Sequence, residues 1–359
     1  MNSSEVEKVA NAVLYEGYLL YPYRPSAVKN RQRWNFGVIS PQSPSPGHGD
    51  SEPAMMQTEC LALGDDHSTL HIKIRFLHLL AREVAEVLTP TPDWREGSES
   101  DLRVVEALEI GGQIFQTWQE AVDRVVQIPS SDLLRLTANP LQISFSFPYG
   151  RETTPLRDPQ GRVAGIIVRR QELVEGLVEV AAQQVTERLF RITVRILNLT
   201  SQDDRGQCRD DSLRRSLVST HTILRIQQGQ FVSLLDPPDP FRQAADACRN
   251  LGTWPVLAGE EGESDTVLSS PIILYDYPKI APESCGDLFD STEIDELLTL
   301  RILTLTDEEK DQMRHVDDRA RQILERAETL QPEQLMKLHG TLRGLEAAKS
   351  TNPERGLDS

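Results

Sequence analysis

The sequence predicts an α+β fold in which strand-rich antiparallel sheets, sandwich-like in arrangement, are followed by a helical C-terminal portion. Between residues 69 and 235, short segments of alternating apolar and polar residues are separated by turn residues, which is typical of antiparallel sheets. After residue 290 the apolar residues recur at helical spacing instead. We therefore expect a strand-rich region over residues 1–290, a helical portion over residues 291–350 docked on it, and a tail over residues 351–359.

The first fifty residues predict a short helix, a strand and a loop. Residues 5–13 fit a helical lead-in, and residues 14–20 are predicted to be a strand because tyrosines cluster there. Pro22 and Pro25 lack a backbone donor and end that strand. Residues 40–54 are rich in Ser, Pro and Gly, so we expect a mobile loop that buries nothing.

The clearest strand covers residues 69–78, where apolar residues at even positions alternate with His71, Lys73 and Arg75. This period of two predicts one buried face and one face in water. Gly111 and Gly112 predict a hairpin between two further strands. The remaining predicted strands are residues 143–147, 163–168, 189–199, 221–226, 231–235 and 271–275.

Helices are predicted toward the C-terminus. Asp239 and Pro240 begin a helix that Gly252 ends. Thr292 and Thr306 each precede an acidic residue by three positions, a spacing that is typical of capped helix starts. The apolar face between these two caps needs a partner surface, because a helix of about a dozen residues is marginal alone in water. Its residues are Ile294, Leu297, Leu298 and Ile302.

Composition and charge restrict the partners and the compartment. The chain has 359 residues and a net charge of −17, which repels phosphate backbones and argues against nucleic acid as a partner. No apolar run reaches the roughly 20 residues that span a bilayer, and the N-terminus lacks the pattern of a signal peptide. We therefore expect a cytoplasmic protein with no membrane span. Its four cysteines have no paired spacing, so we expect free thiols rather than a structural disulfide.

The sequence lacks the common catalytic motifs. The sequence has no phosphate-binding glycine loop, no HExxH, no CxxC and no GxSxG, which argues against ATP- or NAD-dependent chemistry. Cys60, His67, His71 and His78 offer thiolate and imidazole groups that suit zinc or nickel, although their spacing is poor for one metal. We predict neither catalytic residues nor a bound cofactor, and the metal site stays a weak candidate.

Aromatic and basic residues interleave near the N-terminus, and aromatic residues recur just before residue 280. This pattern has three interpretations: a structural aromatic cluster with solvated charges, a nucleic-acid surface that the acidic balance disfavours, or a contact with a protein partner. The candidate partner-binding residues are Tyr21, Tyr23, Arg24, Trp34, Tyr275 and Tyr277.

Two stretches of the chain also carry a resemblance. Residues 13–38, VLYEGYLLYPYRPSAVKNRQRWNFGV, and residues 274–314, which begin LYDYPKIAPESCGDLFD, resemble an uncharacterised family encoded in gene clusters for uptake nickel-iron hydrogenases of actinobacteria and other soil bacteria. The resemblance implies hydrogenase subunits or maturation factors as partners and supplies no catalytic residue. The function we expect is a non-catalytic accessory or assembly protein that acts by binding another protein. The alternative is a small-molecule or metal-handling enzyme with a pocket between the sheets.

Overall fold

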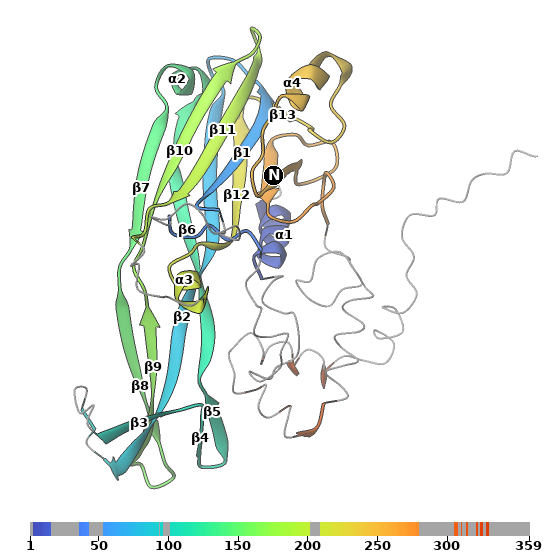
Figure 1. The fold of residues 1–359 in the computed structure, drawn as a ribbon. Helices are drawn as coiled ribbons and strands as arrows, with labels where there is room; N and C mark the ends of the chain where they lie inside the picture. Colours follow the sequence, from blue (N-terminus) through green and yellow to red (C-terminus); the bar gives the residue numbers. More distant parts are fainter. Residues whose placement is uncertain are drawn as a thin grey trace, which may run out of the picture.

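The structure is a computed structural model, in which the description covers residues 3–15, 36–42, 53–92, 94–95, 101–201 and 209–279, with scattered positions between 305 and 329. Figure 1 shows that the described strands form a two-layer sandwich at one end of the molecule and continue into a narrower arm at the other. Every pairing between these strands is antiparallel.

Three sheets contain the described strands. The five-stranded sheet has the order β13 (Gln230–Val232), β1 (Met55–Leu63), β11 (Leu189–Asn198), β10 (Val174–Gln184), β7 (Leu141–Phe147). The eight-stranded sheet has the order β14 (Trp254–Leu257), β15 (Thr266–Ser270), β12 (Val218–Gln227), β2 (Thr69–Thr91), β9 (Val163–Gln171), β8 (Gly150–Arg157), and β3 (Leu102–Val105) and β6 (Trp118–Asp132) also pair with β2. The third sheet is the hairpin of β4 (Ala107–Ile110) and β5 (Gln113–Gln116).

Strand β2 runs through both halves of the molecule. It is 23 residues long, and its first half lies between β12 and β6. Its second half lies between β9 and β3. Residues 80–82 pair with β6 on one side and with β9 on the other, so this level joins the two halves. We call it the waist of the molecule.

The main core fills the space between the two layers of the sandwich. Even-numbered residues in the first part of β2, from Leu70 to Phe76, point into it, and Phe76 is completely buried. Phe76 contacts the rings of Phe145 and Phe147 at centroid separations of 6.1 and 5.6 Å, and these rings close the core toward the waist. Other strands contribute Val178 and Val180, Ile192 and Val194, Leu224, Ile226 and Val267.

The opposite face of the eight-stranded sheet is covered by helix α1 (Ser3–Tyr15). Val6, Val9 and Val13 recur at helical spacing and pack on Ile223 and Leu268. Because helix and core cover opposite faces, β12 is buried on both. The other described helices are single turns or slightly longer: α2 (Leu133–Ala138), α3 (Arg209–Leu213), η4 (Asp239–Phe241) and α4 (Arg242–Asp246).

The antiparallel, strand-rich part of the predicted fold is confirmed, but the α+β class with a helical C-terminal portion is wrong. Among the residues that the structure describes, 54% are in strands, and the helices are few and short. The predicted helix after Asp239 shrinks to η4 and α4, because little more than one turn is enough to set Phe241 and Ala245 against Leu61 and Val232. Residues 291–304 and 330–359, which hold most of the predicted helical portion and the tail, lie outside the described residues.

Two further expectations near the N-terminus and in β2 need correction. Leu14 belongs to α1 and is completely buried, so the predicted strand does not begin there. The predicted water-facing side of residues 69–78 lies beneath α1 instead, and the Arg75 side chain is only 7% exposed. Helix α1, which is distant in sequence, covers this face, and the alternation of residues 69–78 does not indicate that it is covered. Of the predicted loop at residues 40–54, residues 43–52 lie outside the described residues.

Candidate functional site

The four candidate metal ligands lie apart from one another. Cys60 is buried in the sandwich core, and this burial raises the pKa of its thiol. His67 lies on an exposed turn. His71 and His78 belong to opposite faces of β2, because odd positions face α1 and even positions face the core. Across the described ranges, no group of three or more His, Cys, Asp or Glu side chains is arranged to hold a metal ion.

The candidate partner-binding residues fall into two groups. Tyr21, Tyr23, Arg24 and Trp34 lie outside the described residues. Tyr275 is 86% exposed, whereas the ring of Tyr277 packs against the main core. The backbone explains this difference, because Tyr277 has a φ of +57° and its N–H donates to the Leu257 carbonyl at 2.7 Å. Tyr275 is therefore the one of this second pair that can reach a partner.

An apolar groove opens at the edge of the sandwich, close to Tyr275 in the chain. Its volume is about 240 Å³. The groove joins both layers, because Met55 and Met56 come from β1 and Trp254 comes from β14. The remaining lining residues are Phe36, Gly37, Val38, Ile39, Pro53, Gly252 and Pro271. Phe36 and Trp254 are more than a third exposed, so aromatic rings are available at its surface.

Backbone hydrogen bonds fix the wall of this groove that carries Phe36. The N–H groups of Ser219 and Thr220 donate to the carbonyls of Phe36 and Gly37 at 2.9 and 3.1 Å. Ser219 has a φ of +52° and lies in the irregular stretch where β12 shifts register against β2. Gly37 has a φ of +52°, and a Cβ on it would lie 2.7 Å from the Pro271 ring. The groove is therefore built on a strained and closely packed backbone.

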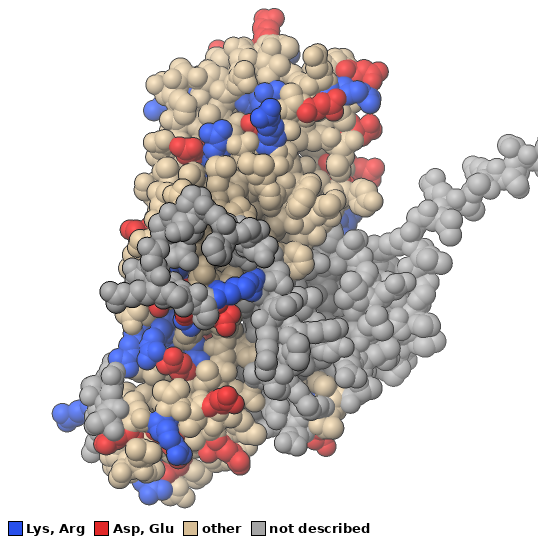
Figure 2. Space-filling model, in the orientation of Figure 1, with Lys and Arg blue, Asp and Glu red and all other residues tan. Residues whose placement is uncertain are grey.

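Exposed apolar side chains continue along the chain from the groove. Leu251 precedes Gly252, and Ile273 and Tyr275 follow Pro271 at alternate positions. All three side chains are exposed. Figure 2 shows acidic and basic side chains scattered over the upper half of the face drawn, with uncharged areas between them. The sequence prediction included Tyr275 but missed Phe36, Met55, Met56 and Trp254, because these four are too far apart in sequence to form a motif.

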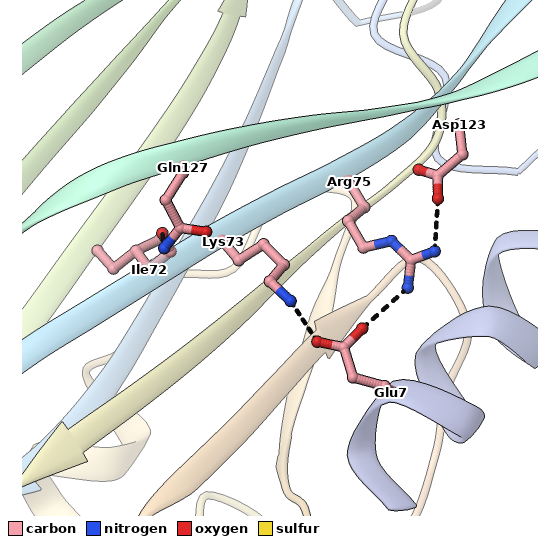
Figure 3. A network of polar contacts seen from close by, with 6 residues as sticks. All are labelled: Glu7, Ile72, Lys73, Arg75, Asp123 and Gln127. Atoms are coloured by element: carbon pink, nitrogen blue, oxygen red, sulfur yellow. Dashed lines mark hydrogen bonds and ion pairs between the residues drawn. The ribbon is translucent and has the colours of Figure 1, made fainter. Parts of the chain in front are cut away.

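A separate polar network lies beneath α1 (Figure 3). Glu7 of α1 contacts Lys73 and also Arg75, which donates to Asp123 of β6 at 2.6 Å. The Arg75 guanidinium thus has a carboxylate on each side. His221, the register partner of Arg75 on β12, is completely buried. Burial, followed by the charge of Arg75, lowers the pKa of His221 to about 3, so the ring is neutral at pH 7. This balanced network fastens α1 to the sheet.

Comparisons with family models, with curated proteins and with solved structures found no match. In the part of the chain that the structure describes, no helix is long and apolar enough to cross a membrane. What the groove can do is therefore argued from its own chemistry: it can take up apolar groups of about its own volume and stack them against two aromatic rings.

Proposed function

We propose that this protein is a non-catalytic accessory or assembly factor that acts by binding another protein, in the nickel-iron hydrogenase setting that the sequence resemblance implies. The observation that carries the binding role is the groove with Phe36 and Trp254 at its surface. Exposed aromatic rings in a fixed apolar pocket are typical of the residues that contribute most to protein interfaces. The exposed Leu251, Ile273 and Tyr275 extend the apolar surface available to the same partner.

The size of the groove favours side chains of a protein over a free small molecule. Pockets that enclose a drug-sized ligand measure roughly 300–1,000 Å³, and this groove measures about 240 Å³. That volume suits one or two apolar side chains projecting from a partner segment. The rigid wall beside Phe36 supports this interpretation, because a preformed pocket loses little conformational entropy on binding.

Location in the cytoplasm is part of the proposal. Cys60 and Cys248 are free thiols, and free thiols are usual where glutathione and thioredoxin keep cysteines reduced. Hydrogenase subunits and maturation factors before export or membrane attachment would meet the protein there. The acidic net charge of −17 favours a partner surface with basic groups around its apolar segment.

Binding assays with paired surface variants test the binding role. Trp254→Ala and Phe36→Ala should each weaken binding to the purified hydrogenase subunits of the same gene cluster at least tenfold, because each removes an aromatic contact. Leu235→Ala is the matched control, since Leu235 is also exposed but is not among the groove-lining residues. Urea unfolding should show that all three variants fold. Undiminished binding by both groove variants would contradict the proposal.

Deletion of the gene tests the hydrogenase setting separately. Loss of the protein should reduce uptake hydrogenase activity and leave unprocessed large subunit in the cells. Restoring the wild-type gene should reverse both effects, whereas the Trp254→Ala gene should not. Normal hydrogenase activity and subunit processing in the deletion strain would remove hydrogenase from the proposal while leaving the groove as a binding site.

The alternative of a small-molecule or metal-handling enzyme has one observation in its favour. The groove does draw its lining from both layers of the sandwich, since Met56 lies on β1 and Trp254 on β14. Native mass spectrometry of the purified protein distinguishes the two functions. A stoichiometric metal or small molecule that is released only on denaturation would favour the enzyme, and loss of that species in Trp254→Ala would place it in the groove.

A further inference from the structure

Strand β7 ends the five-stranded sheet, and its outer edge pairs with no other strand in the described part of the chain. Figure 1 shows it along the outline of the sandwich. The N–H of Leu199 donates to the Glu175 carbonyl, so odd-numbered residues of β10 bond toward β11 and even-numbered ones bond to β7. Through the register of β7 with β10, the backbone N–H and carbonyl groups of Gln142, Ser144 and Ser146 therefore point outward.

The core of the sandwich is open along this edge. The inward-facing apolar residues of β7 are each only partly buried: Leu141, Ile143, Phe145 and Phe147. Directly behind them on β10, Val174, Val178 and Val180 are completely buried. At the opposite edge of the same sheet, Phe231 of β13 is also buried. A further strand beside β7, with apolar residues at matching positions, would complete the cover of the core.

The other edge strands of the described sheets carry features that oppose the addition of a strand. Strands β3, β4, β5, β13 and β14 are only three or four residues long, and β6 and β8 each contain a proline and charged side chains. Short strands, prolines and charges are the usual protection of sheet edges in natural proteins. Strand β7, LQISFSF, has seven residues and no proline or charge. Among the described edges it is the one left open to pairing.

The sequence of β7 is complementary to a second, antiparallel copy of itself. Its apolar residues are placed symmetrically about Ser144, so a copy centred there pairs Leu141 with Phe147 and Ile143 with Phe145 on the inner face. In this register the outward backbone groups of Ser144 bond to those of the Ser144 in the second copy. Those of Gln142 bond to those of Ser146 in the second copy, and the reverse. Every outward N–H and carbonyl group of the strand thereby gains a partner.

The charge distribution favours a second copy of the chain as the occupant of this edge. An uncharged strand offers no ion pair to a basic or acidic partner segment. Two chains with a net charge of −17 repel each other, and this repulsion is smallest where a symmetric contact is made through a strip without charged side chains. Salt screens such repulsion. Association through β7 should therefore become stronger as the ionic strength rises, whereas binding to a basic partner becomes weaker.

We propose that β7 is a dimerisation edge, at which two copies of this protein pair their β7 strands antiparallel about a twofold axis at Ser144. The two five-stranded sheets then form one continuous sheet, with affinity from backbone hydrogen bonds and specificity from alternate side chains. A single pair of short strands is a small interface, so the dimer is reversible. Strands β10 and β11 separate β7 from the groove-lining β1, so each dimer keeps two open grooves. The dimer does not depend on what the grooves bind.

Sedimentation equilibrium of the full-length protein tests the proposal. The wild type should show a monomer–dimer equilibrium that shifts toward the dimer as sodium chloride is added. Ser144→Pro removes an outward N–H and leaves the bonds to β10 in place, so it should fold and weaken the dimer at least tenfold. Ser144→Lys should weaken it similarly, because two ammonium groups then meet at the axis. Ser144→Thr is the matched control, since it keeps the N–H and should leave the equilibrium unchanged.

Cysteine cross-linking tests the register. In the proposed dimer the two Cα atoms of position 144 lie roughly 5.5 Å apart, which a disulfide spans. Ser144→Cys should therefore be linked rapidly by copper–phenanthroline in air, compared with the background from the four native cysteines. Gln142→Cys is the control, because its two copies lie roughly 13 Å apart along the strands and should be linked no faster than wild type. An equimolar mixture of Gln142→Cys and Ser146→Cys should form the mixed dimer.

Four results would overturn the proposal. The first is a wild type that stays monomeric at every concentration and salt level, even if Ser144→Pro then loses binding to a hydrogenase subunit, which would assign the edge to a different protein. The second is a dimer that survives both Ser144→Pro and Ser144→Lys. The third is a dimer that salt weakens, and the fourth is equal cross-linking of Ser144→Cys and Gln142→Cys. Circular dichroism and urea unfolding of each variant distinguish loss of pairing from loss of folding.

Discussion

Phe145 of β7 lies across Gly176 of β10, in the space where any other residue at position 176 would place its side chain. The two residues are register partners in the five-stranded sheet. A Cβ on Gly176 would meet the Phe145 ring, and it would lie 2.8 Å from the Leu197 carbonyl oxygen of the next strand. The ring thus covers a glycine at which the sheet would otherwise expose its backbone, and it belongs to the aromatic contacts that close the core toward the waist.

Gly176→Ala should therefore destabilise the protein. The added methyl group must push the Phe145 ring away or bend β10, and overpacking of this kind typically costs about 1–3 kcal/mol. Urea unfolding gives the free energy directly. Gly150→Ala is the matched control, because a Cβ on Gly150 would lie 3.7 Å from its nearest neighbour, which is ordinary contact. Equal stability of the two variants would mean that the ring moves aside at no cost.

Removal of the Glu7 charge should loosen α1. Glu7→Gln leaves Lys73 without its carboxylate and Arg75 with Asp123 alone. Since the Glu7 side chain is 34% exposed, solvent screening reduces the effect, and we expect a loss of about 1–2 kcal/mol. Glu5→Gln breaks the well-exposed pair with Lys8 on the same helix and should cost less than about 0.5 kcal/mol. Hydrogen exchange of the α1 amides should rise only in Glu7→Gln.

Acid should destabilise the protein through His221. Its folded-state pKa of about 3 is below the value of about 6.5 for an unfolded histidine. Between these values the unfolded chain binds a proton that the folded chain does not, so this stabilising contribution is complete above pH 6.5 and is lost as the pH falls toward 3. The slope is about 1.4 kcal/mol per pH unit for one such group. Urea unfolding at pH 6.5 and 5.0 measures it.

Two variants separate His221 from the other histidines. His221→Gln should show a shallower loss of stability between pH 6.5 and 5.0, although His78, with a folded-state pKa of about 4, still contributes in the same direction. His67→Gln changes an exposed histidine and should leave the slope unchanged. A wild-type slope in His221→Gln would show that this ring is already protonated in the folded protein or that it does not titrate in this range.

The hydroxyl group of Ser269 connects two layers of the sandwich. It lies 2.7 Å from Thr58 Oγ1 of β1 and 2.8 Å from Thr253 Oγ1. Ser269→Ala should cost about 1–3 kcal/mol, because two buried hydroxyl groups lose that partner. Adding Thr58→Val and Thr253→Val should recover part of this loss in urea unfolding, since no polar group then stays unsatisfied. If the triple variant is less stable than Ser269→Ala, side-chain packing rather than hydrogen bonding determines the stability at this site.

The sequence predicted individual strands well where residues adjacent in sequence determine the local structure. The alternation of residues 69–78 and the glycine pair at 111–112 correspond to the start of β2 and to the β4–β5 hairpin. It did not predict the full length of β2, since both faces are covered at residues 74–79 and the alternation of apolar and polar residues is lost there: Leu77 and Leu79 pack with Leu14 and Val38. Segments that are distant in sequence bury both faces there, so apolar and polar residues no longer alternate.

Neither the groove nor the grouping of arginines at the waist could be found from local sequence patterns. The groove combines Phe36, Met56 and Trp254, which are brought together by strand pairing across more than half of the chain. At the waist, Arg82, Arg124 and Arg169 resemble the solvated charges of ordinary strands, and only the register places them on one face. Side-chain types are visible in a sequence, whereas their convergence depends on the long-range pairing of β2 with its neighbours.

Strand β2 also affects how the protein folds during synthesis, because its pairing partners are translated at different times. The ribosome has completed β2 when it reaches Thr91, but β12, which pairs with the first half of β2, is complete only at Gln227. At roughly 5–20 residues per second, one edge of this strand waits on the order of ten seconds for its neighbour. During that interval an unpaired strand edge is exposed and can pair with other nascent chains. Chaperones that bind extended segments during translation should therefore decide how much of the protein a cell recovers in folded form.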